Sequence, residues 1–125
     1  MNKIEIHITE KCNGKCFNCS NLAGIAPSIT ELKIEDIIRF IDESIELNYI
    51  WDSIVLHGGE PTLHPDIDEI CKLFHMYKIK YAPSTKLLIA TNGYGMALNV
   101  CDRIQKYNLF LARHTTNILY SHLYF

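Results

Sequence analysis

Three cysteines near the N-terminus carry the clearest chemical signal in the sequence. Cys12, Cys16 and Cys19 have the spacing C-x-x-x-C-x-x-C within one short stretch. Cysteine thiolates ligate zinc and iron–sulfur clusters, and four of them would close such a site. Three thiolates can hold three corners of a cubane cluster and leave the fourth iron open to another ligand. The spacing therefore indicates a metal centre at which chemistry can take place.

A second group of residues, Gly58-Gly59-Glu60-Pro61, lies well beyond the cysteines. Glycines let backbone atoms approach a ligand without a side-chain clash, and the carboxylate of Glu60 can accept a hydrogen bond from a positive amino group. Glycine pairs also form ordinary turns after strands, in which case Glu60 would be solvated. Taken alone, this group leaves both interpretations open.

The elements that would position these residues alternate between strands and helices. Ile4, Ile6 and Ile8 point to one side of the first strand, while the residues between them point to the other. Later segments switch between the two-residue and the 3.6-residue hydrophobic repeat, which is typical of an α/β fold. The predicted strands are Lys3–Thr9, Ser53–Leu56, Lys86–Ala90 and a fourth that starts at Leu109-Phe110-Leu111, and the predicted helices are Leu32–Leu47, a second opened by Pro65-Asp66, and about Met96–Tyr107.

One polar and one apolar face on the first strand fit a barrel-like parallel sheet with helices outside. His7 and Thr9 are then expected near the C-terminal mouth, with His7 and His57 pointing inward as hydrogen-bonded histidines or ligands. The loop spanning residues 10–29 is too long for a simple connector and carries the cysteines. Ser28 and Glu31 are expected to cap the following helix. Cys71 and Cys101 are expected to be small buried hydrophobes, and no group is recognised around His64, His75, His114 or His122.

Composition describes an ordinary globular protein. The 125 residues are 48% hydrophobic and 21% charged, with a formal net charge of -2, which fits one domain spanning 1–125 and no nucleic-acid partner. No stretch approaches the roughly 20 apolar residues that span a bilayer, and the first residues lack a secretory signal. Five cysteines, an odd number, favour a metal site in the reducing cytoplasm over a disulfide framework.

The two motifs together resemble the N-terminal half of a radical S-adenosylmethionine (radical SAM) core domain. Cys12, Cys16 and Cys19 match the cluster-binding motif of that superfamily, although Asn18 stands where an aromatic residue is usual and Phe17 precedes it. The resemblance implies a [4Fe-4S] cluster held by the three thiolates, with S-adenosyl-L-methionine on the fourth iron. It also implies reductive cleavage of that cofactor, with an electron donor such as flavodoxin or ferredoxin.

The same resemblance implies which residues bind the cofactor. Gly58, Gly59, Glu60 and Pro61 match the second motif of the family, which contacts the methionine amino group. Asn92, in Thr91-Asn92-Gly93, matches the polar turn after the third strand, although Asn-Gly is also a common turn pair. The sequence identifies neither the catalytic residue nor the substrate, which could be a peptide, a protein or a small molecule.

Length sets this chain apart from the family, whose core resembles a six-stranded partial barrel. The expected fold is a partial TIM-barrel-like (β/α) parallel sheet, truncated after three or four strands, with residues 112–125 unassigned. Such a sheet would expose an apolar edge through which the chain could self-associate or bind a partner. Two further interpretations stay open: a noncatalytic remnant that binds a cluster, and a structural zinc site completed by His7, His57 or His64.

Overall fold

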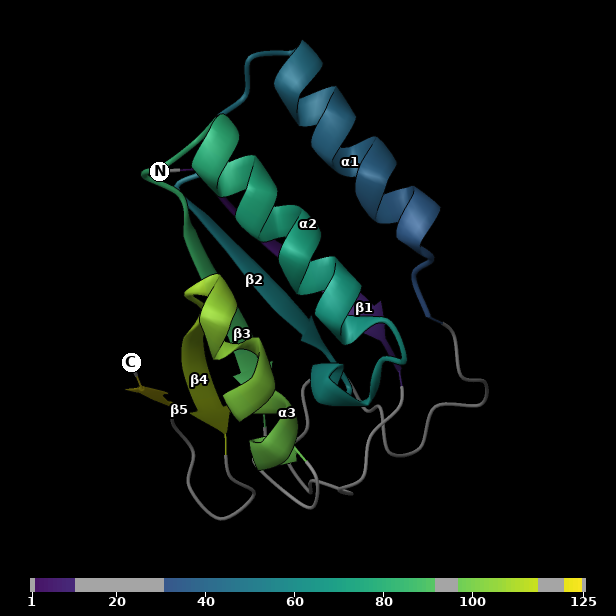
Figure 1. Ribbon diagram of the computed structural model, residues 1–125, viewed down its shortest axis with the longest axis vertical. Helices are drawn as coiled ribbons and strands as arrows, with labels where there is room; N and C mark the ends of the chain where they lie inside the picture. Colours follow the sequence, from purple (N-terminus) through teal and green to yellow (C-terminus); the bar gives the residue numbers. More distant parts are fainter. Residues whose placement is uncertain (1, 11–30, 92–96, 115–120, 125) are drawn as a thin grey trace.

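The structure is a computed structural model that describes residues 2–10, 31–91, 97–114 and 121–124. Within these ranges, the strands form a five-stranded sheet in the order β1-β2-β3-β4-β5, in which β1 to β4 are parallel and β5 is antiparallel to β4. Helices α1, α2 and α3 lie on one side of the sheet (Figure 1). The elements are β1 (Lys3–Thr9), α1 (Ile34–Glu46), β2 (Ser53–Gly58), the 3-10 turn η2 (Pro61–Leu63), α2 (Ile67–Lys80), β3 (Lys86–Thr91), α3 (Ala97–Ile104), the 3-10 turn η3 (Gln105–Tyr107), β4 (Phe110–His114) and β5 (Ser121–Tyr124).

The hydrophobic core lies between the sheet and the helices. Ile6 pairs in register with Leu56, and Leu56 pairs with Ile89, so equivalent side chains of three strands stand side by side. Leu56 and Ile89 are buried beneath the helices together with Phe74 of α2. The alternating pattern thus predicted the helix-covered face correctly, and the prediction of a partial barrel-like parallel sheet is confirmed.

The other face of the sheet carries the two strand histidines. His7 and His57 pair in register, and their ring centroids lie 6.3 Å apart. They share the face away from the helices, as the alternation in β1 predicts. His7 is exposed and His57 half-buried, so neither lies in the hydrophobic core, and their role as hydrogen-bonded histidines or ligands stays a prediction.

Helix α1 lies at the side of the helical layer, next to α2 (Figure 1). The isoleucines of this helix form an apolar stripe that is only partly buried: Ile37 and Ile41 are covered, whereas Ile38 and Ile45 are 41% and 38% exposed. A helix with a neighbour on one flank cannot bury a stripe this wide. The apolar pattern predicted the helix correctly but overestimated its buried surface.

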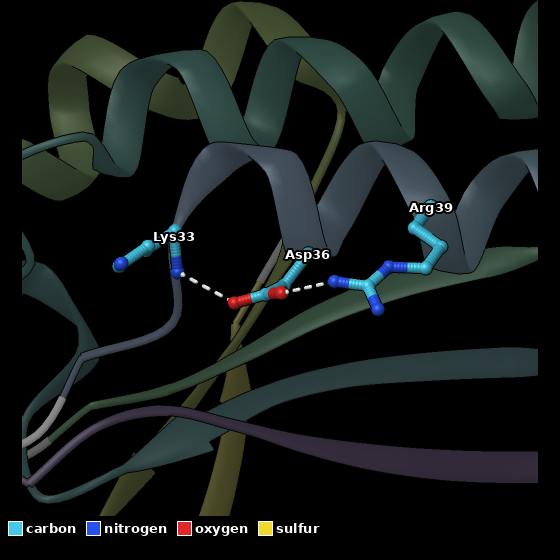
Figure 2. Close-up of polar contacts among 3 residues, drawn as sticks. All are labelled: Lys33, Asp36 and Arg39. Carbon is cyan, nitrogen blue, oxygen red and sulfur yellow. Dashed lines mark hydrogen bonds and ion pairs between the residues drawn. The ribbon is translucent and has the colours of Figure 1, made fainter.

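The start of α1 differs from the predicted capping box. The helix begins at Ile34, and the backbone N–H of Lys33 donates to the carboxylate of Asp36 at 3.2 Å. Figure 2 shows this carboxylate between Lys33 and the guanidinium of Arg39, which lies 2.7 Å from it. Asp36 therefore supplies the capping carboxylate that was predicted at Glu31, because the helix starts later than the sequence suggests. Ser28 lies outside the described residues.

Helix α2 also starts later than predicted. It begins at Ile67 after an N-cap at Asp66, so Pro65 precedes the helix instead of opening it. Another proline, Pro61, occupies the first position of η2. This extra turn lies between β2 and α2. The buried face of α2 includes Cys71, as predicted.

The predicted fourth strand is present, and it continues into the C-terminal stretch left unassigned from the sequence, which also contributes a fifth strand. β4 begins at Phe110 and continues to His114, and β5 then pairs with β4 in the antiparallel direction. The outer edge beyond β4 is therefore a strand of only four residues, and short edge strands limit edge-to-edge pairing. Self-association through this edge stays a prediction. None of the helices in the described part of the chain is long and apolar enough to cross a membrane.

Candidate functional site

The candidate site lies where the first three strands end. β1, β2 and β3 are parallel neighbours, so Thr9, Gly58 and Thr91 come to the same edge of the sheet. Thr9 pairs directly with Gly58 after an irregularity in the β1–β2 register. In parallel sheets this carboxyl edge is where ligands bind. The fold therefore brings the second motif to the end of the strand that precedes the cysteines.

Gly58 allows this close approach of two backbones. Its φ of +151° is a conformation that L side chains rarely adopt, and an added Cβ would overlap the carbonyl oxygen of Thr9. The next N–H, from Gly59, donates to the same oxygen at 2.8 Å. At Gly58 the glycine is therefore required by the packing of β1 against the turn after β2.

The loop that carries the cysteines starts and returns at this edge. The N–H of Leu32 donates to the carbonyl of Ile8 at 2.9 Å, and Thr9 forms an isolated antiparallel bridge with Glu31. The Thr9 hydroxyl also donates to the Glu31 carboxylate at 3.3 Å. Both ends of the segment are thus fastened to the end of β1. The predicted metal ligands themselves, Cys12, Cys16 and Cys19, lie outside the described residues.

Glu60 is buried, with 1% of its surface exposed. Its Oε2 atom accepts hydrogen bonds from the backbone N–H of Thr62 at 3.2 Å, from the Thr62 hydroxyl, and from the Thr91 hydroxyl at 2.7 Å. A carboxylate removed from water needs such donors. The alternative of a solvated turn carboxylate is therefore wrong. Pro61 is buried beside it as the first residue of η2.

Thr62 and Thr91, the threonines that hold Glu60, were not predicted as site residues from the sequence. Thr62 stands two residues after a carboxylate that opens a turn, a local arrangement recognisable from sequence. Thr91 comes from another strand, and only the register of the sheet brings it to Glu60. The neighbouring Asn92, a predicted cofactor-binding residue, lies outside the described residues.

His64, named from the sequence only as a candidate zinc ligand, links two parts of the site. Its side chain is buried, with Nε2 at 2.8 Å from the carbonyl oxygen of Leu32. Its Nδ1 accepts the backbone N–H of Asp66 at 3.0 Å. Because both ring nitrogens have partners, binding zinc through His64 would break one of these contacts. Within the described ranges, no three His, Cys, Asp or Glu residues are grouped to hold a metal ion.

The two helical cysteines, Cys71 and Cys101, are neither nucleophiles nor metal ligands in this site. Burial, with smaller effects from Asp68 and Cys101, raises the pKa of the Cys71 thiol to about 12. Burial, followed by the nearby carboxylates of Glu60 and Asp102, raises the pKa of Cys101 to about 11. Both thiols stay protonated at neutral pH, whereas nucleophiles and metal ligands are thiolates. The prediction that they are buried hydrophobes is confirmed.

Comparison with known proteins gives consistent matches. The family model described as the Radical SAM superfamily matches residues 6–118. A GTP 3',8-cyclase from Nautilia profundicola is 31% identical over 93 residues, which cover 73% of this chain and 27% of that protein. An S-adenosylmethionine-dependent nucleotide dehydratase from a Thermoplasmatales archaeon is 34% identical over 88 residues, 70% of this chain and 28% of that protein.

A solved structure has a similar fold. The crystal structure of BtrN in complex with AdoMet and 2-DOIA matches with a TM-score of 0.65 and 21% identity, covering 86% of this chain and 42% of that one. At this level of identity the likeness shows the fold alone. The chain spans about a quarter of the length of the curated relatives that it matches.

Proposed function

The chain belongs to the radical SAM superfamily, and from this we propose that it provides the part of a radical SAM enzyme that binds a [4Fe-4S] cluster and S-adenosylmethionine. The observation that carries the proposal is that the two described ends of the cysteine-bearing segment lie at the same sheet edge as the second motif. The loop with the cysteines is fastened to Thr9, and Thr9 accepts the N–H of Gly59 in the second motif. Thr9, Glu31 and Gly59 are far apart in sequence but lie at one sheet edge, where one cofactor could contact both motifs.

The residues fit these cofactors by their chemistry. Cys12, Cys16 and Cys19 would supply three thiolates, which leaves one iron for an exchangeable ligand. When bound, the cluster supplies one electron for reductive cleavage of the sulfonium and hence a 5'-deoxyadenosyl radical. The task of the protein is to bind, orient and keep water away.

The turn after β2 would bind the methionine part of the cofactor. Gly58 lets the turn pack against the Thr9 backbone, and we assign Gly58 and Gly59 to the cofactor because residues without side chains let backbone atoms approach a ligand. The Glu60 carboxylate is fixed by Thr62 and Thr91, and its negative charge complements a positive amino group. We assign Asn92 to the same cofactor because it directly follows Thr91 in the chain.

A small molecule is the proposed substrate class. The names of two sequence relatives, a GTP 3',8-cyclase and a nucleotide dehydratase, refer to nucleotide chemistry, and this favours a small molecule over a peptide. A flavodoxin or ferredoxin in the cytoplasm is the proposed electron donor. The chain spans only about a quarter of the length of these relatives, so the substrate itself is not assigned.

Anaerobic reconstitution tests the proposal. The protein is loaded with iron and sulfide, reduced with dithionite and supplied with S-adenosylmethionine, and iron, zinc and 5'-deoxyadenosine are measured. We expect about four irons per chain and production of 5'-deoxyadenosine. Cys16→Ala should lose the iron, whereas the control Cys71→Ala, which changes a buried thiol, should keep it.

The other interpretations give different results. Iron without cleavage of the cofactor would support the noncatalytic remnant. Stoichiometric zinc in place of iron would support the structural zinc site. Full iron binding by Cys16→Ala would contradict the ligand assignment.

A further inference from the structure

His64 joins two segments that are far apart in sequence, and no motif assigns it a role. Its side chain is only 3% exposed. On one side it contacts the carbonyl oxygen of Leu32, where the cysteine-bearing loop returns to the fold, and on the other it contacts the N–H of Asp66 at the start of α2. A buried imidazole placed between these two segments can control their separation.

The two partners fix the proton on the imidazole. The backbone N–H of Asp66 can only donate, so Nδ1 of His64 must be the unprotonated acceptor. The carbonyl of Leu32 can only accept, so Nε2 must carry the hydrogen. The geometry thus assigns the Nε2–H tautomer, with each nitrogen committed to one backbone atom.

These contacts complete a closed ring at the sheet edge, made of three hydrogen bonds and the chain segments that connect them. Leu32 donates to Ile8 at 2.9 Å, and the next residue, Thr9, accepts from Gly59 at 2.8 Å. The chain then continues from Gly59 through the turn to His64, which returns to Leu32. A shift of the loop end would therefore disturb the glycine turn directly, and the reverse also holds.

We infer that His64 is a positioning residue that holds the returning end of the cysteine-bearing loop against the cofactor-binding turn. This inference rests on the proposed function for its consequence, because the loop would carry the cluster and the turn would bind S-adenosylmethionine. The hydrogen bond between Nε2 and Leu32 joins the loop end to the turn, and we call this link the coupling. The hydrogen bond between Nδ1 and Asp66 holds only the turn itself. The two contacts can be separated by mutation.

His64→Asn and His64→Gln form a matched pair. Asparagine places its carboxamide oxygen near the position of Nδ1 and can accept the N–H two residues later, but it is too short to reach Leu32. Glutamine places an amide nitrogen near the position of Nε2 and can still donate to Leu32. A purely local role predicts that asparagine is the better replacement. The coupling role predicts that glutamine is.

The first readout needs no cofactor. In the apo protein, amide hydrogen exchange at Leu32 should become faster by roughly ten-fold in His64→Asn, because the loss of one hydrogen bond releases the loop end. His64→Gln should stay within about three-fold of the original protein. In the unmutated protein, nitrogen NMR of the imidazole should show the hydrogen on Nε2, a test that survives even if a variant does not fold.

The second readout is the affinity of the reconstituted protein for S-adenosylmethionine, measured by spectroscopic titration. We expect about ten-fold weaker binding for His64→Asn and near-original binding for His64→Gln at similar thermal stability. Equal affinities in the two variants, or a hydrogen on Nδ1, would overturn the inference. If the unmutated protein binds no cofactor, the proposed function fails, while the exchange data still decide whether His64 holds the loop end.

Discussion

The hydroxyl of Thr91 donates a hydrogen bond to Oε2 of Glu60 at 2.7 Å, across 31 residues of sequence. Thr91 ends β3, and Glu60 opens the turn after β2. Both side chains are buried, so the hydroxyl offsets part of the cost of removing a carboxylate from water. This contact orients the carboxylate that we assign to the cofactor.

Thr91→Val should therefore weaken both folding and cofactor binding. Valine keeps the shape of threonine but leaves the carboxylate without this donor, which should cost about 1.5–3 kcal/mol in the free energy of unfolding. Urea unfolding measures the loss, and titration with S-adenosylmethionine measures the binding. Thr91→Ser keeps the hydroxyl and is the control. Equal stability of the valine and serine variants would show that the hydrogen bond contributes nothing.

Gly58→Ala should disturb the junction of β1 and β2. The new Cβ would overlap the Thr9 carbonyl, and alanine would be forced into an unfavourable φ, a strain of roughly 1–3 kcal/mol before any clash is counted. Thermal unfolding should show a large loss of stability. Gly59→Ala is the comparison, since Gly58 is the one glycine with positive φ in the described part of the chain. The prediction fails if both alanine variants unfold at the same temperature.

Asp36→Ala should destabilise the start of α1. Its carboxylate accepts the Lys33 N–H and lies in the first turn, where negative charge is favourable, so we expect a loss of about 1 kcal/mol. Arg39→Ala removes only an exposed ion pair with the same carboxylate and should cost less than about 0.5 kcal/mol. Chemical denaturation distinguishes the two. An equal loss in both variants would mean that the ion pair, and not the cap, stabilises the helix.

The two buried thiols should make folding sensitive to alkaline pH. Burial raises the pKa of Cys71 to about 12 and that of Cys101 to about 11, from an ordinary value of 9.0. The unfolded chain thus loses these protons first, so their contribution to stability is complete below about pH 9 and is lost as pH rises toward 11–12.

The measurement is urea unfolding at a series of alkaline pH values. The double variant Cys71→Ala/Cys101→Ala will be less stable throughout because it leaves cavities, so the slope of stability against pH is compared. We expect a shallower fall between pH 9 and 12 in the double variant. An unchanged slope would show that the thiols ionise equally easily in the folded and unfolded states.

Much of the fold could be predicted from hydrophobic periodicity. The first strand, Lys3–Thr9, has its predicted bounds, because strict alternation identifies a half-buried strand. Helix starts were less predictable: α2 begins after Pro65 because a 3-10 turn is inserted between β2 and the helix. The strand β5 was missed because its four residues show no period and it depends on pairing with β4.

In the candidate site, too, local motifs could be predicted from the sequence and long-range contacts could not. The glycine turn was recognisable because its residue types are needed locally. The roles of Thr91 and His64 were not, because each acts on a segment about thirty residues away that only the folded sheet brings close. Sequence motifs thus predicted the residues expected to touch the cofactor, and the structure added those that hold them in place.

The most direct test of the central claim is the electron paramagnetic resonance spectrum of the anaerobically reconstituted, reduced protein, recorded without and then with S-adenosylmethionine. The predicted result is a [4Fe-4S] signal that shifts when the cofactor is added, because the open iron gains a new ligand. A cluster signal that does not change on addition, or a protein that takes up no iron, would contradict the proposed function.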